Sequence, residues 1–230
     1  MKIKLVKKTE EAKGTISFFW ETEKPVEYLP GQYFYYTLPK LNYPDPRGTT
    51  RHFTISSSPT EGKLLRLTTR IREESGFKKT LDELTIGAEI EGEGPNGTFI
   101  LDENDQGMNH VFLAGGIGIT PFRAFIKYNV DKNLKIPMHL IYSNSNSDFV
   151  YKKELEDWAK NYDFVKVYFF DTSKSGHLED KNIKDLVATD LLSSVFWTVG
   201  PPPYVDAMEV ALNKLKVASE NIRSEKFTGY

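Results

Sequence analysis

The sequence predicts a two-domain protein, in which an antiparallel β-barrel over residues 1–103 is followed by an α/β domain with a Rossmann-like parallel sheet over residues 104–230. Short strands of alternating polarity, broken by proline and glycine turns, fill the first half. Apolar runs that alternate with helical stretches fill the second half. An acidic and polar stretch, Asp102–Met108, marks the expected boundary.

Six strands and one short helix are expected in the first half. Pro30-Gly31, Pro44, Pro46-Arg47-Gly48 and Pro95-Asn96-Gly97 supply the turns between them. Closing such strands into a barrel removes exposed sheet edges. The expected strands are Lys2–Lys7, Thr15–Trp20, Tyr33–Leu38, Arg51–Ser56, Leu64–Ile71 and Glu89–Glu93, and the helix is Lys78–Leu84.

Strands and helices alternate in the second half. Strands that are apolar throughout belong in a parallel sheet covered on both faces. The expected strand and helix pairs are His110–Ala114 with Pro121–Tyr128, Met138–Tyr142 with Tyr151–Asn161, Val165–Phe170 with Ile183–Val187, and Val195–Val199 with Tyr204–Val217.

Composition excludes several function classes. The net charge of −2 gives no broad cationic field for nucleic acid. The chain has no cysteine, which excludes disulfides, thiolate zinc sites and cysteine-ligated iron–sulfur clusters within it, and the four histidines have no metal-site spacing, so no metal is expected. The first residues carry lysines without a following apolar run, and no stretch has the length of a membrane span. A cytoplasmic protein is expected.

A glycine loop follows the first strand of the second half. Gly115, Gly116 and Gly118 let the backbone turn sharply and let a ligand approach without a Cβ in the way. Thr120 is expected to cap the following helix and Pro121 to occupy its first position. The free amides at such a helix start favour a phosphate or another electron-rich group, although a tight strand-to-helix turn needs glycine as well.

A second signal ends the last apolar strand. Gly200 is followed by Pro201, Pro202 and Pro203, which cannot continue a strand or sit inside a helix. The run predicts a rigid corner at the carboxyl edge of the sheet, where open α/β sheets bind ligands. Taken alone, it also fits a stiff loop.

These segments together resemble the ferredoxin–NADP reductase superfamily, an FAD-binding barrel followed by a nicotinamide-binding domain. Arg51-His52-Phe53-Thr54-Ile55-Ser56-Ser57 is similar to the family's Arg-x-Tyr-Ser-x-x-Ser flavin motif, and Ser75-Gly76-Phe77-Lys78 is similar to its pyrophosphate loop. The glycine loop and Val199-Gly200-Pro201-Pro202 are similar to its nucleotide loop and its Cys-Gly-Pro-Pro corner. The match runs through the whole chain in the family's order.

The resemblance implies roles for named residues. Arg51 would clamp the FAD pyrophosphate, with His52 beside it or the adenine, and the amides of Gly76, Phe77 and Lys78 would hold the other phosphate. The remaining FAD contacts would come from Phe53 on the isoalloxazine, the Thr54 hydroxyl at flavin N5, and Thr69 and Arg70 at the flavin edge. The nicotinamide nucleotide would contact residues at the ends of three strands of the second half. These are Gly115, Gly116, Gly118, Thr120, Pro121, Ser143, Asn144, Gly200, Pro201 and Pro202. Both Phe53 and Thr54 can touch the flavin only if the strand ends or bulges there, because successive side chains alternate between faces.

Three positions depart from the family pattern. Phe53 replaces its tyrosine and loses a phenol hydrogen bond, whereas Thr54 replaces its serine and keeps the hydroxyl. Val199 replaces the corner cysteine, so hydride transfer would depend on positioning without a thiol.

The implied activity is a stand-alone FAD-dependent NAD(P)H reductase. Hydride would pass from the nicotinamide to flavin N5, and electrons would then pass to a separate redox protein or small acceptor; ferredoxin, flavodoxin, a haem protein and a quinone all remain open. Two alternatives are a flavin reductase that uses diffusible flavin and a non-enzymatic FAD-binding electron-transfer subunit. The sequence carries no signal for oligomeric state.

The nucleotide preference and the C-terminus carry two further expectations. The segment Tyr142–Asp148 has no arginine for a 2′-phosphate, so a modest preference for NADH is expected. The last residues alternate like an edge strand that closes on Tyr230. By resemblance, Tyr230 would stack on the flavin face that the nicotinamide must reach, and Glu225 would relay a proton near N5.

Overall fold

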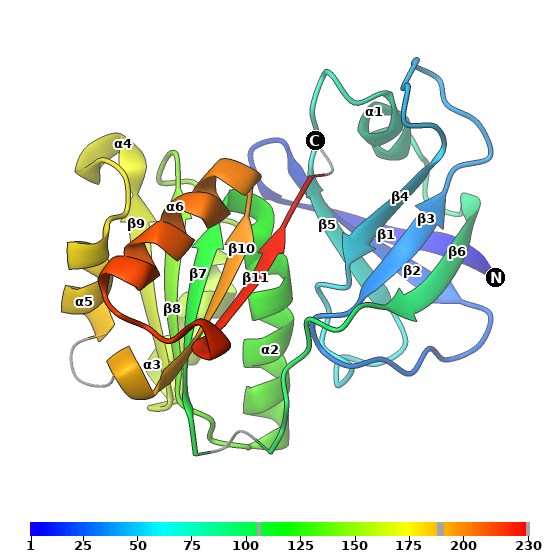
Figure 1. The fold of residues 1–230 in the computed structure, drawn as a ribbon. Helices are drawn as coiled ribbons and strands as arrows, with labels where there is room; N and C mark the ends of the chain where they lie inside the picture. The colour runs from blue at the N-terminus through cyan, green and yellow to red at the C-terminus, as the bar shows by residue number, and fades with distance from the viewer. Residues whose placement is uncertain (105–106, 188–190, 229–230) are drawn as a thin grey trace. The chain divides into compact units, whose positions relative to one another are not determined.

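The computed structural model describes residues 1–104, 107–187 and 191–228. Contacts divide them into two compact units, one of Met1–Leu101 with Arg123–Tyr128, the other of Asp102–Phe122 with Asn129–Thr228. Figure 1 draws the elements of both units. No helix among the described residues is long and apolar enough to cross a membrane.

The first unit is built on a six-stranded sheet in the order β4-β3-β6-β1-β2-β5 with antiparallel pairing. A bridge between Ile55 and Leu67 joins the segment after β4 to β5, so the sheet closes into the expected barrel. Its core is formed by aromatic and aliphatic side chains such as Trp20, Phe34 and Phe77, all fully buried. The elements are β1 (Lys2–Ala12), β2 (Thr15–Thr22), β3 (Tyr33–Thr37), β4 (Thr50–Thr54), β5 (Leu65–Arg70), α1 (Gly76–Asp82) and β6 (Glu89–Asn96).

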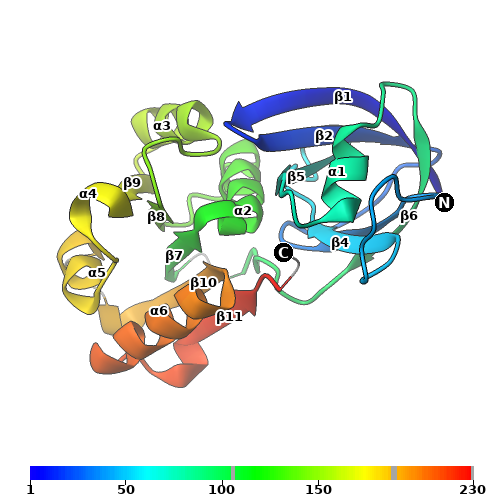
Figure 2. The ribbon, with the colours of Figure 1, turned by 90° about the horizontal axis from the view of Figure 1, so that it is seen from above.

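The second unit is a five-stranded sheet in the order β11-β10-β7-β8-β9, with parallel pairing throughout. Helices α2 and α3 lie on one face of this sheet, and α5 and α6 lie on the other (Figure 2). Its elements are β7 (Asn109–Gly115), η1 (Gly116–Gly118), α2 (Ile119–Lys132), β8 (Met138–Asn144), α3 (Lys152–Asn161), β9 (Val165–Asp171), α4 (Thr172–Ser175), α5 (Asp180–Val187), η2 (Leu191–Ser193), β10 (Ser194–Gly200), α6 (Pro202–Lys214), η3 (Ser219–Asn221) and β11 (Ile222–Lys226).

The strand order shows where the chain passes from one side of β7 to the other. Chain order runs outward from β7 to β8 and β9, then returns to β10 on the other side of β7. In open α/β sheets ligands bind at the carboxyl ends of the strands at this reversal. Gly115 ends β7 and Gly200 ends β10, so the two predicted loops lie at the reversal point.

Side-chain packing holds both faces of the parallel sheet. On one face, Val111 and Ile141 of the strands join Ile183 of α5 and Leu212 of α6 in one buried cluster. On the other, Phe112 stacks on Phe122 of α2 with ring centroids 4.7 Å apart. The strands covered on both faces are therefore apolar throughout, as the sequence pattern indicated.

Each of the five predicted helices starts one to three residues from its expected position, and two of these differences change the roles expected of loop residues. Helix α2 begins at Ile119 with Gly118 at its N-cap, so Thr120 is not the cap; its hydroxyl donates to the Ile117 carbonyl at 3.1 Å. Pro121 is the third helical residue, still within the first turn, where its missing N–H costs nothing. Helix α6 begins at Pro202, so the expected corner residues Pro202 and Pro203 form its first turn.

Candidate functional site

A cluster of charges surrounds the start of α1 in the first unit. The Lys78 side chain lies among the cations of Arg47, Arg51 and Arg72 and the carboxylate of Glu74. Burial, reinforced by Arg72, lowers the pKa of Lys78 to about 8, and only 5% of the residue is exposed. The lowered pKa is therefore due first to burial, and the neighbouring cations add to it.

One further carboxylate belongs to this cluster. Asp45, in the loop before β4, forms a 2.6 Å ion pair with Arg51, and both side chains are almost fully buried, with 5% and 6% exposed. Burial opposes ionisation of Asp45, but hydrogen bonds from the Phe77 and Arg47 amides and the Arg51 charge outweigh it and lower its pKa. Asp45 thus pairs with Arg51, and Glu74 lies 3.8 Å from Arg72, while Arg47 and Lys78 are the further cations near this loop.

Hydrogen bonds change the predicted role of the helix-start amides. The Phe77 amide donates to Asp45 Oδ2 at 3.0 Å, and the Lys78 amide donates to the N-cap side chain of Ser75 at 3.3 Å. Two of the three amides assigned to a phosphate by resemblance are thus already bonded within the chain. Side-chain cations, rather than these amides, are the groups left to meet a diphosphate here.

The flavin-motif residues divide between the two faces of β4. Phe53 points toward the core, with ring centroids 6.0 Å from Tyr36 and 6.1 Å from Phe77. His52 lies on the opposite face against Tyr33, with ring centroids 4.9 Å apart. Burial and the charge of Arg47 lower the pKa of His52. His52 thus joins an outer aromatic patch beside a cation of the cluster.

Thr54 is the last residue of β4. The strand therefore ends at the position where it had to end or bulge for Phe53 and Thr54 to contact the same ligand. Its side chain makes no hydrogen bond among the described residues and is therefore available to a ligand. Thr69 is 2% exposed on β5, and Arg70, the last residue of β5, is partly exposed. Alternation places Thr69 and Arg70 on opposite faces of the strand, so one of them faces away from any given ligand.

The glycine loop of the second unit is packed against its neighbouring strand. A Cβ at Gly118 would lie 2.2 Å from the Val199 carbonyl oxygen, and one at Gly115 would lie 2.5 Å from the Tyr204 ring. These two glycines make room for protein atoms, not for a ligand. Gly116 is different, because its φ is +55° and a Cβ there would meet open space. Among the three glycines of this loop, Gly116 is the one that combines left-handed geometry with free approach.

The carboxyl end of β8 carries the residues assigned to the nucleotide ribose. Ser143 is 5% exposed and lies in register with Gly115. The Asn144 amide donates within its own turn, to Asn146 and to the Asp148 carbonyl at 3.1 Å. Asn144 therefore stabilises the loop, and its amide group is not presented to a ribose as expected.

Asp171 is a residue that sequence reasoning missed. It ends β9 in register with Asn144, and its carboxylate accepts from the Ser173 amide at 3.0 Å. The hydrogen bond of the Ser173 hydroxyl to this group leads the causes that lower the Asp171 pKa. The signal was available in the sequence, since an acidic residue directly follows a run of apolar strand residues.

The C-terminal strand supports part of the prediction made for it. β11 is an edge strand, as expected, and Glu225 lies in register with Val199 of β10. Burial raises the pKa of Glu225 to about 7, and its Oε2 has no hydrogen-bond partner among the described residues. Tyr230 lies outside the described residues.

Comparison with known proteins gives both halves of the chain a family. Residues 2–100 match the model described as oxidoreductase FAD-binding domain, and residues 112–209 match the model described as oxidoreductase NAD-binding domain. A flavohemoprotein of Bacillus subtilis is 29% identical over 97% of this chain. A glycine betaine monooxygenase reductase subunit of Pseudomonas aeruginosa is 27% identical over 90% of it.

This chain spans 58% of the length of each of those two relatives. Among solved structures, a ferredoxin-NADP+ reductase from Plasmodium falciparum superposes with a TM-score of 0.81 at 19% identity, covering 98% of this chain and 95% of that one. At that identity the likeness speaks for the fold alone. The two domain matches, which together cover most of the chain, show that it belongs to the oxidoreductases that bind FAD and a nicotinamide nucleotide, and its fold is that of the ferredoxin–NADP reductase superfamily.

Proposed function

We propose that this protein is an NADH-preferring reductase that keeps FAD bound and delivers electrons to a separate one-electron acceptor. The observation that carries the proposal is that one chain matches an FAD-binding domain and an NAD-binding domain, each with a candidate nucleotide segment of different character. The first unit has the cations of Arg47, Arg51 and Arg72 around the buried Lys78, and the second has an uncharged glycine loop where β7 and β10 end. A charged site suits a cofactor that remains bound through the reaction, and an uncharged backbone loop suits a nucleotide substrate that binds and dissociates in each cycle.

Each residue has a limited part in the proposed reaction. When bound, FAD accepts a hydride from the nicotinamide and releases electrons singly. Phe53 would give the flavin an apolar contact, and the Thr54 hydroxyl would donate a hydrogen bond to it. Gly116 would let the nicotinamide nucleotide approach the backbone. Glu225, half protonated near neutral pH, would hold or release a proton at its unpartnered Oε2.

The acceptor is proposed from the relatives. One is named a reductase subunit of a monooxygenase and another a flavohemoprotein. Because this sequence contains no cysteine, a cysteine-ligated iron–sulfur centre would have to lie outside it. We therefore propose a haem or iron–sulfur protein as the acceptor, with a ferredoxin among the candidates. Reduction of ferricyanide, a one-electron acceptor, by NADH and the purified protein tests electron delivery without knowledge of the partner.

The preference for NADH follows from the ends of β8 and β9. Within Tyr142–Asp148 there is no arginine to neutralise a 2′-phosphate, and Asp171 adds a negative charge beside Asn144. We expect the kcat/KM of the wild-type protein to favour NADH modestly over NADPH. Asp171→Asn should reduce this preference. Asp163→Asn, a control change on the loop before β9, should leave the preference unchanged. A wild-type ratio that favours NADPH tenfold or more would overturn this assignment.

Two other functions make different predictions for purified protein. A flavin reductase would be colourless and would reduce added flavin with NADH. An electron-transfer module without nucleotide chemistry would be yellow but would not react with NADH or NADPH. The segment Ser75–Lys78, which is similar to the family's pyrophosphate loop, favours retained FAD over diffusible flavin, because FAD carries the diphosphate that such a loop would hold.

A further inference from the structure

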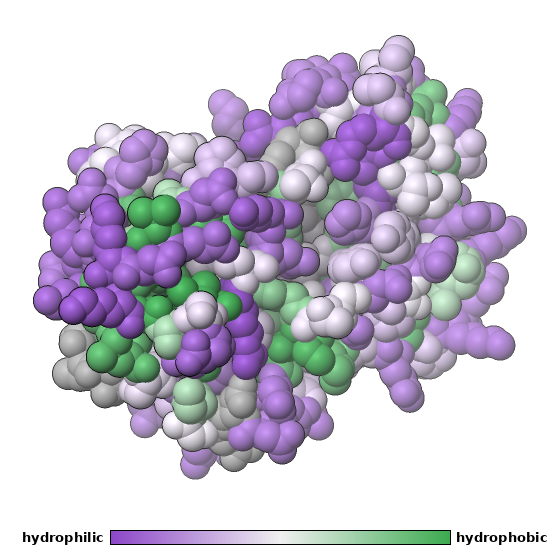
Figure 3. Space-filling model, viewed as in Figure 1, coloured by the Kyte–Doolittle hydropathy of each residue, from purple (hydrophilic) through white to green (hydrophobic). Residues whose placement is uncertain are grey.

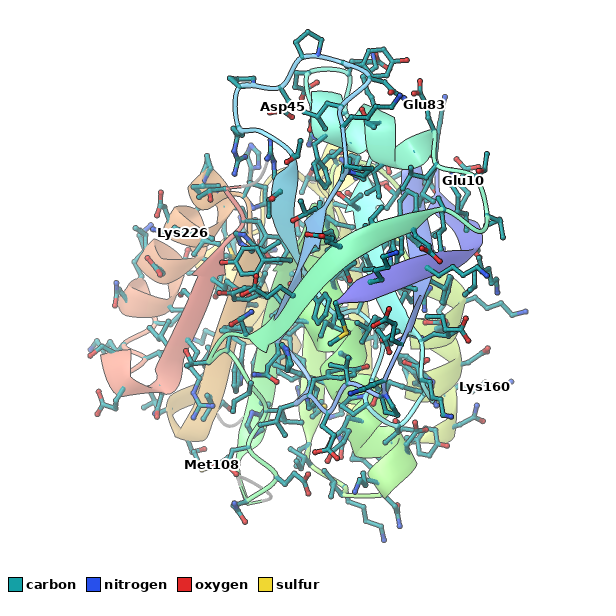
Figure 4. The ribbon with its side chains drawn as sticks, turned by 90° about the vertical axis from the view of Figure 1, so that its right-hand side faces the viewer. Glu10, Asp45, Glu83, Met108, Lys160 and Lys226 are labelled. Atoms are coloured by element: carbon teal, nitrogen blue, oxygen red, sulfur yellow. The ribbon has the colours of Figure 1, made fainter. Side chains whose placement is uncertain are left out.

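The Ser56–Glu61 turn connects the end of β4 with β5. β4 ends at Thr54, whose hydroxyl makes no hydrogen bond among the described residues and is left for a ligand. Figure 4 shows Asp45 in the loop before β4, and the Ser56–Glu61 turn follows the opposite end of that strand. The Ser56 amide donates to the Arg66 carbonyl at 2.8 Å. β5 therefore holds the turn through an amide that lies two residues after Thr54.

A side chain from the second half of the sequence holds the carbonyl of the same residue. Arg123 is a residue of α2, but its contacts place it with Met1–Leu101 in the first unit. It is 2% exposed, and its Nη1 donates to the Ser56 carbonyl at 2.8 Å. Ser56 is thus fixed by β5 at its amide and by Arg123 at its carbonyl.

Glu61 closes the turn on Arg123. Its carboxylate accepts from Arg123 Nη1 at 2.6 Å and Nη2 at 2.8 Å, and from the Ser58 amide at 2.6 Å. Burial opposes ionisation of Glu61, but the hydrogen bond and charge of Arg123, the Ser58 amide and the charge of Arg66 outweigh it and lower its pKa. The pair is therefore ionised at neutral pH, and its two parallel bonds require the planar fork of an arginine.

The middle residue of the turn is fixed as well. The Tyr28 hydroxyl donates to the carbonyl of Ser57, the last residue of the flavin motif, at 3.1 Å. Burial raises the pKa of Tyr28, so this hydroxyl stays protonated and can donate. Side chains thus hold three successive residues, Ser56, Ser57 and Ser58, while the nearby Thr54 hydroxyl is left unbonded within the chain. A backbone held firmly beside such a hydroxyl is what a pre-organised ligand contact requires.

We propose that Arg123 is a positioning residue of the FAD site, which fixes the Ser56–Glu61 turn through the Ser56 carbonyl and Glu61 and thereby sets the position of Thr54. Arg123 acts through these groups and makes no contact with the flavin. The barrel of residues 1–103 is then not a complete FAD-binding unit, because a side chain of α2 completes it. This inference rests on the proposed binding of FAD and is independent of the electron acceptor.

The test combines two measurements on flavin-free protein: the affinity for FAD, from quenching of flavin fluorescence, and the denaturant concentration at the midpoint of unfolding. We expect Arg123→Met and Glu61→Gln each to weaken FAD binding about 10-fold, since each loses charge-assisted hydrogen bonds that hold the turn. Both single variants should also unfold at a lower denaturant concentration, because each leaves a largely buried charge without its partner.

The double variant separates positioning from stability. Arg123→Met combined with Glu61→Gln removes both charges, so the unfolding midpoint should return toward the wild-type value. FAD should still bind about 10-fold more weakly than to wild type, because the Ser56 carbonyl has lost its Arg123 donor. A role in folding alone predicts that the affinity recovers together with the midpoint.

Glu11→Gln is the matched control. It breaks the Arg66–Glu11 ion pair of the same unit, which has the same 2.6 Å separation and is also largely buried. We expect a lower unfolding midpoint and an unchanged affinity for FAD. The visible circular dichroism of bound flavin should change in the double variant and stay as in wild type in Glu11→Gln. If a single variant fails to fold, the double variant and Arg123→Lys, which keeps the charge but not the fork, still measure the effect on FAD.

Wild-type affinity for FAD in the double variant, or in Arg123→Met alone, would overturn the positioning role. So would an equal loss of affinity in Glu11→Gln, because any break in a buried ion pair of this unit would then have the same effect. If wild-type protein does not bind FAD at all, the cofactor assignment itself fails before any variant is compared.

Discussion

The charged cluster around Lys78 in the first unit and the glycine loop of the second are built in opposite ways. Around Lys78 the fold gathers charged side chains, and hydrogen bonds to Asp45 hold Arg51 and the start of α1 in place. Around Gly118 it uses no charge and packs bare backbone against the end of β10. A site lined by charged side chains binds a charged ligand through ionic interactions that are costly to break. A turn lined by backbone atoms selects a ligand by its shape and lets it dissociate more easily. The contrast matches a resident cofactor and an exchanging substrate.

The largest expected effect comes from filling the glycine loop. In Gly118→Ala, the new Cβ would lie 2.2 Å from the Val199 carbonyl oxygen, so the loop or β10 must move. We expect reduction by NADH to fall about 100-fold or more, because small misplacement of reacting groups is costly. FAD content should stay at the wild-type level, since the first unit is untouched.

Gly107→Ala is the matched control for this variant, because a Cβ there would meet open space. Absorbance of bound flavin and steady-state rates measure the two properties separately. Loss of FAD together with activity in Gly118→Ala would show that the two sites are not independent.

The charged site should reveal itself through pH. A diphosphate beside Lys78 raises its pKa above the value of about 8 that it has without ligand, so FAD binding takes up a proton. Affinity should be constant well below pH 8 and should fall by up to about tenfold per pH unit above it. Lys78→Met should remove this dependence and weaken binding at pH 7. Calorimetric titration in buffers of different ionisation enthalpy measures the proton uptake, and a pH-independent wild-type affinity would exclude Lys78 from the site.

Glu225 gives a smaller effect, on stability. Burial raises its pKa to about 7 in the folded protein from 4.5, so the folded state holds the proton more tightly. The stability linked to this group is fully present below the lower value and is lost as pH rises through about 7. At pH 8, Glu225→Gln should therefore unfold at a higher denaturant concentration than wild type, with a free energy of unfolding larger by about 1–3 kcal/mol. Near pH 4 the free energies of unfolding of the two proteins should be equal. Equal stability at both pH values would place the Glu225 carboxylate in solvent.

The smallest effect concerns the ring that supports the glycine loop. The Tyr204 hydroxyl is buried without a partner among the described residues, while its ring fills the space beside Gly115 and Gly200. Tyr204→Phe should change the free energy of unfolding by no more than about 1 kcal/mol, toward greater stability, and leave the KM for NADH unchanged. Thermal unfolding and steady-state kinetics check this, and a higher KM would show that the hydroxyl binds the nucleotide.

Much of the fold could be predicted because the two halves of the chain follow different rules of hydrophobic patterning. Every predicted strand is present, and even the edge position of β11 followed from its alternation. The first strand extends to Ala12, five residues beyond the prediction, because Lys8, Thr9 and Glu10 pair with β2 although their side chains are polar. Hydrophilic residues cover much of the surface seen in Figure 3. A strand segment whose residues are all polar lacks the alternation of polar and apolar residues from which strands were predicted.

The site was less predictable than the fold. A lone aspartate in a proline-rich loop is typical of a turn, so nothing in the local sequence connects Asp45 with Phe77. Only tertiary structure reveals that Arg51 pairs with Asp45 and that Gly118 makes room for Val199. Motifs indicated the candidate segments, but which atoms in them can meet a ligand depends on contacts between segments distant in the chain.

The central claim, that a nicotinamide nucleotide reduces FAD held by this protein, is tested most directly by an anaerobic titration. Purified protein is followed at the flavin absorption band while NADH, and in a parallel experiment NADPH, is added stepwise. The account predicts yellow protein whose band bleaches with about one equivalent of NADH, the stoichiometry of a hydride transferred to one flavin. Yellow protein that neither nucleotide bleaches would contradict it.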